Sequence, residues 1–239
     1  MPSLAQLIER IGVPINNPQL IKAAVTHRSF RNERHLEPDL ESNERLEFLG
    51  DAILSFCATR LIFQRFPTFS EGQMTEIRAA LVRASALADL ARSFDLGAFL
   101  RLSRGEVSSG ARTREALLAD TFEALLGAIF LDGGLAAVEQ FLLPLLEQRL
   151  EGVDPNDLLD ARSVLQERVQ SERGITPRYT TIATQGPEHR RAYTVAVYAG
   201  EQLLGVGEGL GKQAAARVAA RVALAHLNHP AADSAEQNQ

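Results

Sequence analysis

The sequence predicts a chain of two domains, an all-α domain followed by a smaller α+β domain with the element order α-β-β-β-α. Three observations favour this fold class. The length of 239 residues exceeds that of one typical domain. Apolar residues recur at spacings of three and four through the first 150 residues, whereas runs of β-branched and aromatic residues occur only later. Residues 151–157, rich in Gly, Pro, Asn and Asp, separate the two patterns.

The first part divides into helical segments wherever the apolar spacing is interrupted. We expect helices over Leu4–Ile11, Leu20–Val25, Leu46–Phe63, Ile77–Phe94, Ala116–Leu131 and Ala137–Leu150. Ser42, Ser70 and Thr113 are the expected helix starts, and Gln73 completes a capping box with Ser70. Asp132-Gly133-Gly134 predicts a helix end.

The second part combines helical and strand patterns. We expect a helix over Ala161–Glu172, strands over Arg178–Thr184, Ala192–Ala199 and Gln202–Gly207, and a last helix over Gly211–Leu227. We therefore place the two domains at residues 1–150 and 160–228, with a linker at 151–159. Residues 229–239 offer little apolar surface to pack, so they are predicted to form a disordered tail.

The overall composition is that of a globular protein, with 45% hydrophobic and 23% charged residues, which excludes wholesale disorder. Apolar runs such as Ala124–Leu131 stop short of the roughly 18 residues that a membrane span requires. The N-terminal pattern is amphipathic and carries Glu9 and Arg10, unlike a secretory leader. Cys57 is the single cysteine and is expected to be a small buried apolar residue. We expect a cytoplasmic protein that does not enter a membrane.

The net charge of −5 would argue against a nucleic-acid binder if it were evenly distributed. Residues 1–153 carry 16 Lys and Arg against 20 Asp and Glu, whereas residues 154–228 carry 9 against 8. The acidic excess therefore lies mainly in the first part, and an RNA-binding role for the second part stays open.

Two groups of carboxylates in the first part are candidates for chemistry. At about 100° per residue, Glu44, Glu47 and Asp51 fall within an arc of roughly 60° on one helix face. Asp120 and Glu123 lie three residues apart on a second helix. For any single acidic residue, a solvated helix face is the commoner role.

The surroundings of Asp120 and Glu123 favour a different role. These two are nearly the only charges between Leu117 and Leu131, so the helix is expected to be largely buried. Burying two carboxylates costs free energy unless a cation accompanies them.

Four oxygen ligands on two helices suit a hard ion such as Mg²⁺, or Mn²⁺ in its place, rather than zinc. Glu47, Asp51, Asp120 and Glu123 together carry four negative charges, which two divalent ions would neutralise. This is the arrangement of a two-metal phosphodiesterase, in which one ion helps to deprotonate the attacking water and the other stabilises the leaving oxygen.

Other catalytic or cofactor-binding templates fail. The glycine-rich segment Gly205–Lys212 lacks the P-loop residues at Val206 and Gln213, so no nucleotide cofactor is expected. There is no G-x-S-x-G motif. The only histidines at a spacing that suits a metal, His226 and His229, lie at the end of the last helix, where chance explains them.

Two acidic segments resemble the ribonuclease III family: ESNERLEFLGDAIL at residues 41–54 and LLADTFEALLGAIFLDGG at residues 117–134. The second part resembles a double-stranded-RNA-binding domain, through SVLQERVQ, GPEHRRAYTVAV and GKQAAARVAARVAL in that order. Together the resemblances extend over residues 1–228. They imply an all-α endonuclease domain followed by a domain that binds double-stranded RNA.

The resemblance implies roles for individual residues. Glu47, Asp51, Asp120 and Glu123 match the metal-binding carboxylates of the family, with Asp51 and Glu123 also counted as catalytic. Glu44 and Glu71 match acidic positions that handle the RNA strand and support the site. Phe48 matches a residue that packs across a homodimer interface, although its helical position alone would favour a place in the core of its own chain.

For the second domain the resemblance implies three sets of RNA contacts. Such domains bind A-form RNA through two successive minor grooves and the phosphates between them. The matching residues are Ser163, Gln166 and Glu167 in the first helix, Pro187 and His189 between strands, and Lys212 and Gln213 at the last helix. His189 and Gln166 alone would be ordinary surface residues. Gln213 departs from the family pattern, which is usually basic there, so phosphate binding is expected to be weaker.

The carboxylates and the resemblance together predict a Mg²⁺-dependent endoribonuclease that cuts double-stranded RNA. The resemblance further implies that the enzyme is a homodimer and leaves 5′-phosphate and 3′-hydroxyl ends. Precursors of ribosomal RNA and other structured transcripts are the expected substrates. A regulator that binds double-stranded RNA without cutting it is the alternative, although the complete set of four carboxylates counts against it. A helical interaction scaffold is a third hypothesis, and it predicts no RNA binding.

Overall fold

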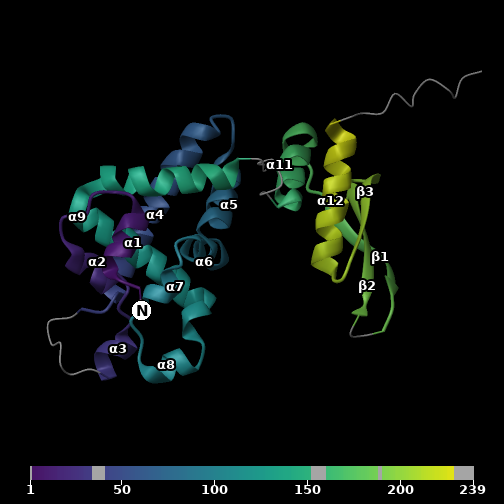
Figure 1. The fold of residues 1–239 in the computed structure, drawn as a ribbon. Helices are drawn as coiled ribbons and strands as arrows, with labels where there is room; N and C mark the ends of the chain where they lie inside the picture. The colour runs from purple at the N-terminus through teal and green to yellow at the C-terminus, as the bar shows by residue number, and fades with distance from the viewer. Residues whose placement is uncertain (1, 34–40, 152–159, 188–189, 229–239) are drawn as a thin grey trace, which may run out of the picture. The chain divides into compact units, whose positions relative to one another are not determined.

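The structure is a computed structural model of the chain, and it describes residues 2–33, 41–151, 160–187 and 190–228. The chain divides into two compact units, residues 1–153 and 154–239 (Figure 1). The predicted tail, His189 and all of the predicted linker except Glu151 lie outside the described residues.

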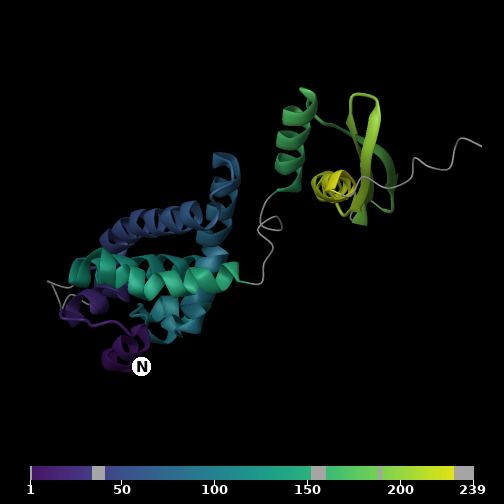
Figure 2. The same ribbon diagram turned by 90° about the horizontal axis from the view of Figure 1, so that it is seen from above.

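The first unit is all-α, as predicted. Its elements are α1 (Leu4–Ile11), α2 (Pro18–Ala24), α3 (Arg28–Glu33), α4 (Glu44–Arg65), α5 (Glu71–Val82), α6 (Ala84–Ser93), α7 (Leu96–Phe99), α8 (Arg104–Ser108), the 3-10 helix η1 (Ala111–Thr113) and α9 (Glu115–Leu150). Helices α4 and α9 lie side by side in both ribbon views and form the most extensive helix pair of the chain (Figures 1 and 2). This pair positions the acidic residues.

The predicted helix starts have different outcomes. The capping box at α5 is confirmed: the Ser70 hydroxyl accepts a hydrogen bond from the Gln73 amide at 3.3 Å, and the Gln73 side chain accepts one from the Ser70 amide at 2.9 Å. Ser42 is not a cap, because its hydroxyl donates to the Glu44 carboxylate at 2.9 Å and Asn43 precedes the helix. Thr113 lies in the 3-10 helix, and α9 begins two residues later.

The prediction of one helix over Ile77–Phe94 is wrong. Arg83 has extended backbone angles, φ −61° and ψ 149°, and separates α5 from α6. The apolar spacing continues across this break, so periodicity alone did not detect it. The predicted end at Asp132–Gly134 appears as a break inside α9, where Gly134 has a φ of 71° and a ψ of −169°.

Helix α9 crosses the core of the first unit. It is the one helix among the described ranges that is long and apolar enough to cross a membrane, and half of its apolar stretch is buried within the protein. Leu118, Leu125 and Leu126 are almost completely buried there. The sequence analysis looked only for uninterrupted apolar runs. Charged residues interrupt the runs of α9, so the analysis did not identify a helix of this length and hydropathy. The prediction that Cys57 is buried is confirmed.

The second unit has the predicted α-β-β-β-α order. Its elements are α11 (Ala161–Arg173), β1 (Arg178–Gln185), β2 (Ala192–Ala199), β3 (Gln202–Gly209) and α12 (Lys212–Asn228). The strands form an antiparallel sheet in the order β1-β2-β3, and Val195 of β2 pairs with Thr181 and Gly207. Both helices pack on one face of this sheet (Figures 1 and 2).

Small residues allow α12 to lie close to β3. A Cβ atom at Gly207 would lie 2.2 Å from the backbone nitrogen of Ala219, and one at Gly205 would lie 2.6 Å from its carbonyl oxygen. The alanine-rich composition of α12 therefore reflects a helix that packs with its backbone near the sheet.

Candidate active site

Helices α4 and α9 touch through two glycines. A Cβ atom at Gly50 would lie 1.7 Å from the carbonyl oxygen of Glu123, and a Cβ atom at Gly127 would lie 2.2 Å from the carbonyl oxygen of Leu46. Real Cβ atoms do not approach so closely, so only glycine permits this contact. The acidic residues of both helices flank the contact, and its closeness sets the separation between them.

This contact brings three of the predicted carboxylates together. Glu47 of α4 and Asp120 and Glu123 of α9 each offer an oxygen atom within 4.8 Å of the others, and all three side chains are half-buried. The sequence spacing placed each on a helix face, and the crossing of the helices places those faces opposite one another. Three carboxylates at this separation form a strongly negative site.

The surroundings oppose the charged form of these carboxylates. Burial, followed by the charges of Asp51, Asp120 and Glu47, raises the pKa of Glu123 to about 7. Burial also raises the pKa of Glu47, to which Asp120 and Glu44 contribute, and it raises the pKa of Asp120. A site that holds protons so firmly is one where a bound cation would relieve desolvation and repulsion together.

Asp51 and Glu44 lie at the margin of this site. Asp51 is exposed and lies outside the group of three, yet its charge raises the pKa of both Glu123 and Glu47. Glu44 lies in the first turn of α4, where Arg28 pairs with it at 3.4 Å.

Glu71 does not join the three carboxylates within one chain. It is the first residue of α5 and accepts a hydrogen bond from the Thr75 hydroxyl at 3.1 Å. It lines a cavity of about 130 Å³ beside the C-terminal half of α4, together with Thr59, Phe63 and Met74. The site residues on α4 lie at the other end of that helix.

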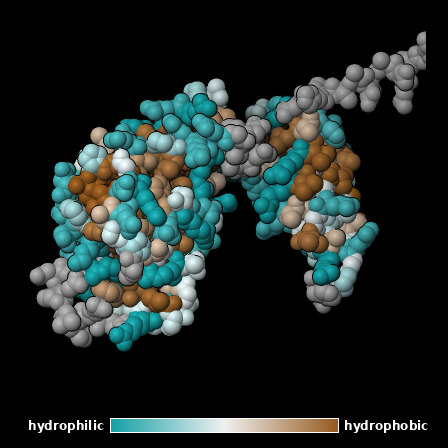
Figure 3. Space-filling model, in the orientation of Figure 1, coloured by the Kyte–Doolittle hydropathy of each residue, from teal (hydrophilic) through white to brown (hydrophobic). Residues whose placement is uncertain are grey.

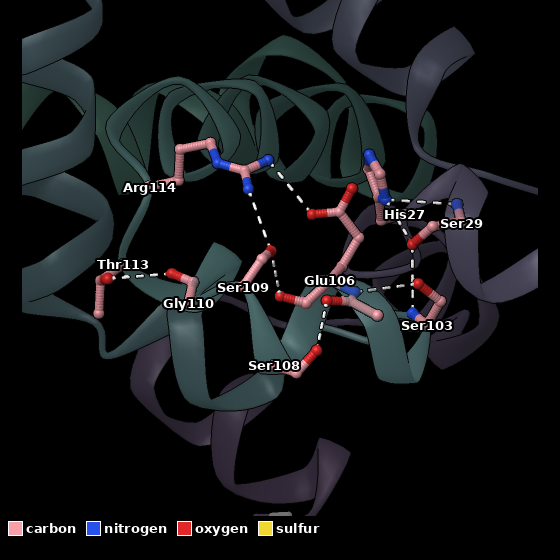
Figure 4. Close-up of polar contacts among 10 residues, drawn as sticks. His27, Ser29, Ser103, Glu106, Ser108, Ser109, Gly110, Thr113 and Arg114 are labelled. Carbon is pink, nitrogen blue, oxygen red and sulfur yellow. Dashed lines mark hydrogen bonds and ion pairs between the residues drawn. The ribbon is translucent and has the colours of Figure 1, made fainter.

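A polar network connects the segment before α3 to α8 (Figure 4). The His27 Nδ1 atom lies 2.8 Å from the Ser29 hydroxyl oxygen, which also accepts a hydrogen bond from the Ser103 amide at 3.1 Å. The Ser103 side chain caps α8, where Glu106 pairs with Arg114 at 3.2 Å. Burial raises the pKa of Asp120 overall, although the nearby His27 ring acts in the opposite direction and lowers it.

Apolar residues remain on the visible faces of both units (Figure 3). On α4 three phenylalanines are exposed, with 82% of Phe48, 52% of Phe56 and 67% of Phe63 accessible to solvent. They fall within an arc of about 80° on the helix. The interpretation of Phe48 as a core residue of its own chain is therefore wrong, because its ring lies almost entirely in solvent.

The predicted RNA contacts all lie on the second unit. Ser163, Gln166 and Glu167 are exposed on α11, Pro187 is exposed after β1, and Lys212 and Gln213 are exposed in the first turn of α12. That turn contains no acidic residue. Its free backbone N–H groups and positive dipole end suit a phosphate group.

The sequence analysis missed the role of Gly50 and Gly127. A glycine inside a helical pattern costs stability and often has a packing reason, and this signal was available at both positions. Which surface each glycine meets depends on how the helices cross, so the sequence alone offered no partner.

Gly50→Ala should lower both stability and activity, because the new methyl group must push α9 away from α4. We expect the free energy of unfolding to fall by about 1–3 kcal/mol, as in overpacked cores, and any metal-dependent activity to fall with it. Thermal unfolding and activity measurements test this expectation. Gly105→Ala is the matched control, since the only atom near its Cβ would be the Ser103 hydroxyl oxygen at 4.0 Å. Equal stability of the two variants would contradict the proposed contact.

Comparison with protein families gives two matches. Residues 17–149 match the family model described as Ribonuclease-III-like, and residues 161–227 match the double-stranded RNA binding motif. The first match contains every residue of the acidic site, and the second contains both helices and all strands of the second unit apart from the last residue of α12.

Curated relatives match along most of the chain. The chain is 54% identical to ribonuclease 3 of Roseiflexus sp. (strain RS-1) over 93% of its own length and 94% of that protein. It is 44% identical to ribonuclease 3 of Geobacter sulfurreducens over 91% of its length and 88% of that protein.

Solved structures match the first unit. The nuclease domain of ribonuclease III from Campylobacter jejuni matches 64% of this chain and all of that domain, with 32% identity and a TM-score of 0.57. A second structure of the same domain has 33% identity and a TM-score of 0.56, matching 61% of this chain and 97% of that domain. It is described as showing structural flexibility in the region involved in dimer formation.

Proposed function

The chain belongs to the ribonuclease III family, and from this premise we propose that it is a homodimeric, Mg²⁺-dependent endoribonuclease that cuts double-stranded RNA. The observation that supports the proposal most is the group of half-buried carboxylates at the α4–α9 contact, in a chain that also carries a double-stranded RNA binding motif. One part offers a site for metal-assisted hydrolysis of phosphodiesters, and the other offers a means of holding the substrate.

The carboxylates fit a hard divalent cation. The three close side chains offer only oxygen atoms, which suits Mg²⁺ or Mn²⁺ better than a thiophilic metal. We propose that Glu47, Asp120 and Glu123, with Asp51 at the exposed edge, hold the ions. Bound there, Mg²⁺ would offset the charge of the phosphate and favour ionisation of the attacking water.

The residues of the chain explain why the metal is required. Without a cation, a negative phosphate would approach Glu47, Asp51, Asp120 and Glu123, which would repel it. At neutral pH Glu123 retains a proton about half of the time, because its pKa is about 7. Cation binding must displace this proton, so we expect Mg²⁺ affinity to increase as the pH rises through 7 and to level off only once Glu123 is fully ionised.

The exposed phenylalanines support a homodimer formed by two α4 helices. An antiparallel pairing about a twofold axis near Phe56 would place Phe48 next to Phe63 of the partner subunit. Phe63 borders the cavity of about 130 Å³, which Ile62, Met74 and Thr75 also line. Phe48 would enter this cavity and bury a ring that one subunit leaves exposed.

The same pairing offers a role for Glu71. Glu71 lines the cavity that would receive the partner's Phe48. Because Glu47 is adjacent to Phe48 in sequence, each Glu71 would approach the acidic site of the other subunit. We propose that Glu71 supports catalysis across the interface, which accounts for its position away from the carboxylates of its own chain.

In this dimer each site would cut one strand and leave a 5′-phosphate, a 3′-hydroxyl and a short 3′ overhang. Incubation of a long RNA duplex with the full chain, with Mg²⁺ or with EDTA, tests the proposal. We expect short duplex fragments only with Mg²⁺, and no cleavage of DNA duplexes of the same sequence. Cleavage that persists in EDTA would contradict the metal assignment.

A regulator that binds RNA without cutting it is the second candidate. The retained carboxylates and their raised pKa values count against it, since a binding protein would gain stability by losing them. Binding of the duplex without cleavage in any divalent metal would favour this alternative. Processing of ribosomal RNA precursors and other structured transcripts, and a cytoplasmic location, stay predictions.

Gln213→Lys should tighten duplex binding. Gln213 is exposed in the first turn of α12 next to Lys212, so a lysine there would add a cation at the expected phosphate contact. The log–log salt dependence of affinity should steepen by about one unit or somewhat less. The helix dipole opposes a cation at this end by only a few tenths of a kcal/mol.

Titration of the full chain with duplex RNA in EDTA at several salt concentrations measures this change. Gln140→Lys, at an exposed position of α9, adds the same charge to the first unit and is the control. If Gln213→Lys and the parent protein give coincident lines, position 213 does not face phosphate.

A further inference from the structure

His27 lies beside the acidic site without belonging to its group of carboxylates. The Thr26 carbonyl oxygen accepts a hydrogen bond from the Asn43 amide at 2.9 Å, and the His27 amide donates to the Arg101 carbonyl oxygen at 3.1 Å. Thr26 and Asn43 are both buried. The backbone of His27 is therefore fixed next to the start of α4, and Glu47 lies one helical turn after Asn43.

Hydrogen bonds determine which nitrogen of the His27 ring carries the proton. The backbone amide of Ser29 donates to Nδ1 at 3.2 Å, so Nδ1 must offer a lone pair. The Ser29 hydroxyl oxygen lies 2.8 Å from the same atom and accepts a hydrogen bond from the Ser103 amide at 3.1 Å. The proton of the neutral ring is therefore on Nε2, which makes Nε2 a hydrogen-bond donor.

The Nε2 atom is free to meet a ligand. Figure 4 shows it on the edge of the ring that points away from Ser29 and Ser103. It has no hydrogen-bond partner in the parts of the chain that the structure describes, and it is not buried, so an incoming group can reach it. Burial lowers the pKa of His27, so the ring is mainly neutral at pH 7.

The charges around the ring leave room for an anion. The charged side chains close enough to influence the ring, or to be influenced by it, are Arg28, Glu44, Glu106, Arg114 and Asp120. The first four form two ion pairs, Arg28 with Glu44 at 3.4 Å and Arg114 with Glu106 at 3.2 Å. The last, Asp120, is one of the proposed metal ligands. Once a cation offsets the charge of Asp120, every acid in this group has a positive partner.

We propose that the Nε2–H group of His27 donates a hydrogen bond to a phosphate oxygen of the RNA strand that is cut, at a phosphate next to the scissile one. The inference rests on the proposed function and deepens it, because it adds a substrate-binding residue outside the four carboxylates. A phosphate oxygen only accepts hydrogen bonds, which matches a ring whose other nitrogen is occupied by Ser29. Because the metal ions would hold the scissile phosphate, a residue at the margin of the site would reach a neighbouring one.

His27→Asn removes the donor and keeps the contact with Ser29. The Oδ1 atom of Asn can replace Nδ1 and accept from the Ser29 amide, whereas no N–H group remains at the position of Nε2. Single-turnover cleavage of duplex RNA with saturating Mg²⁺ should slow by about tenfold to a hundredfold, the effect of losing a hydrogen bond to a charged group. His226→Asn, at an exposed position of α12, is the matched control and should cleave like the parent protein.

His27→Gln separates the lost donor from a loss of structure. The amide nitrogen of Gln can occupy the position of Nε2, so this variant should cleave faster than His27→Asn. Thermal unfolding of the metal-free proteins should give the opposite order, because Gln does not replace the acceptor that the Ser29 amide uses. If both measurements rank His27→Asn above His27→Gln, His27 has only a structural role.

The Mg²⁺ dependence separates contact with phosphate from support of Asp120. The Mg²⁺ concentration that gives half-maximal cleavage should be the same for His27→Asn and the parent protein. A higher concentration for the variant, with the parental rate restored at saturation, would mean that His27 acts on the metal site and would overturn the inference.

Duplexes with a single methylphosphonate in the cut strand identify the phosphate. Each replaces one charged oxygen beside the cleavage position with a methyl group. At the phosphate that His27 contacts, this change should slow the parent protein, and it should slow His27→Asn no further. Additive losses at every phosphate that flanks the cut would contradict the proposed contact.

The outcomes distinguish this inference from the proposed function. If the parent protein does not cleave duplex RNA with Mg²⁺, the proposed function fails. If the parent protein cleaves and His27→Asn cleaves equally fast, the proposed function stands and the role of His27 is wrong.

Discussion

Glu123→Gln should reduce cleavage of duplex RNA by about a hundredfold to a thousandfold while duplex affinity stays close to that of the parent protein. The substitution keeps the size of the side chain and removes its negative charge. Glu123 is the carboxylate of the site with the most strongly raised pKa, and it lies at the contact between α4 and α9. Loss of its charge removes one of the proposed metal ligands without removing a group that attracts RNA.

Single-turnover cleavage with Mg²⁺ and duplex binding in EDTA measure the two effects separately. Glu115→Gln is the matched control, because Glu115 is exposed in the first turn of the same helix and lies outside the acidic site. If Glu123→Gln cleaves nearly as fast as the parent protein, Glu123 is not part of the metal site. Loss of RNA binding together with cleavage would assign it a role in holding substrate.

The metal-free protein should also show the effect of Glu123 on stability. The pKa of Glu123 is raised from 4.5 to about 7, so the folded state binds the proton more tightly than the unfolded state. The stabilisation that this tighter proton binding gives the folded state is therefore fully present below pH 4.5 and is lost as the pH rises through 7. In EDTA, Glu123→Gln should match the parent at low pH and be more stable above pH 7.

The expected difference above pH 7 is on the order of 1–2 kcal/mol, less than the full shift implies, because solvent screens part of the repulsion at these half-buried groups. Urea unfolding at pH 5 and pH 8 measures it. A variant that is less stable than the parent at pH 8 would show that the Glu123 charge is compensated in the folded protein.

Phe48→Glu should convert the proposed dimer into monomers. The substitution places a charge where Phe48 would enter the cavity beside Phe63 of the partner subunit. Burying that charge there would cost more than the apolar contact contributes. The monomer should still fold, because 82% of Phe48 is already exposed in a single chain. Cleavage should fall when the dimer is lost, because Glu71 would then no longer reach the acidic site of the other subunit.

Sedimentation equilibrium and thermal unfolding separate association from folding. Leu203→Glu makes the same change at an exposed apolar residue of β3 and should leave the mass unchanged. A Phe48→Glu protein that sediments like the parent would rule out the proposed pairing through α4. A large loss of thermal stability in dilute monomer would instead indicate that the ring packs within its own chain.

Elements with strong local signals could be predicted from the sequence. Strand β2 was predicted with its observed bounds, and the capping box at Ser70 was predicted together with its partner Gln73. These features depend on residues close together in the chain. The break at Arg83 and the short helices α7 and α8 were missed, because a break that preserves apolar spacing, or a helix of one turn, leaves no period to detect.

For the candidate site, the sequence by itself determined which side chains are available and which face of its own helix each occupies. Helical spacing is a local property, so it holds for Glu47 and Asp51, and for Asp120 and Glu123, whatever the rest of the chain does. The kinds of atom that could bind a metal follow from the same residues.

Only the tertiary structure decided which of these groups meet. The distance between α4 and α9 depends on their crossing, which the missing Cβ atoms of Gly50 and Gly127 permit. Distances between elements arise from the packing of residues that are remote in sequence, and the local periodicity of the sequence carries no information about them.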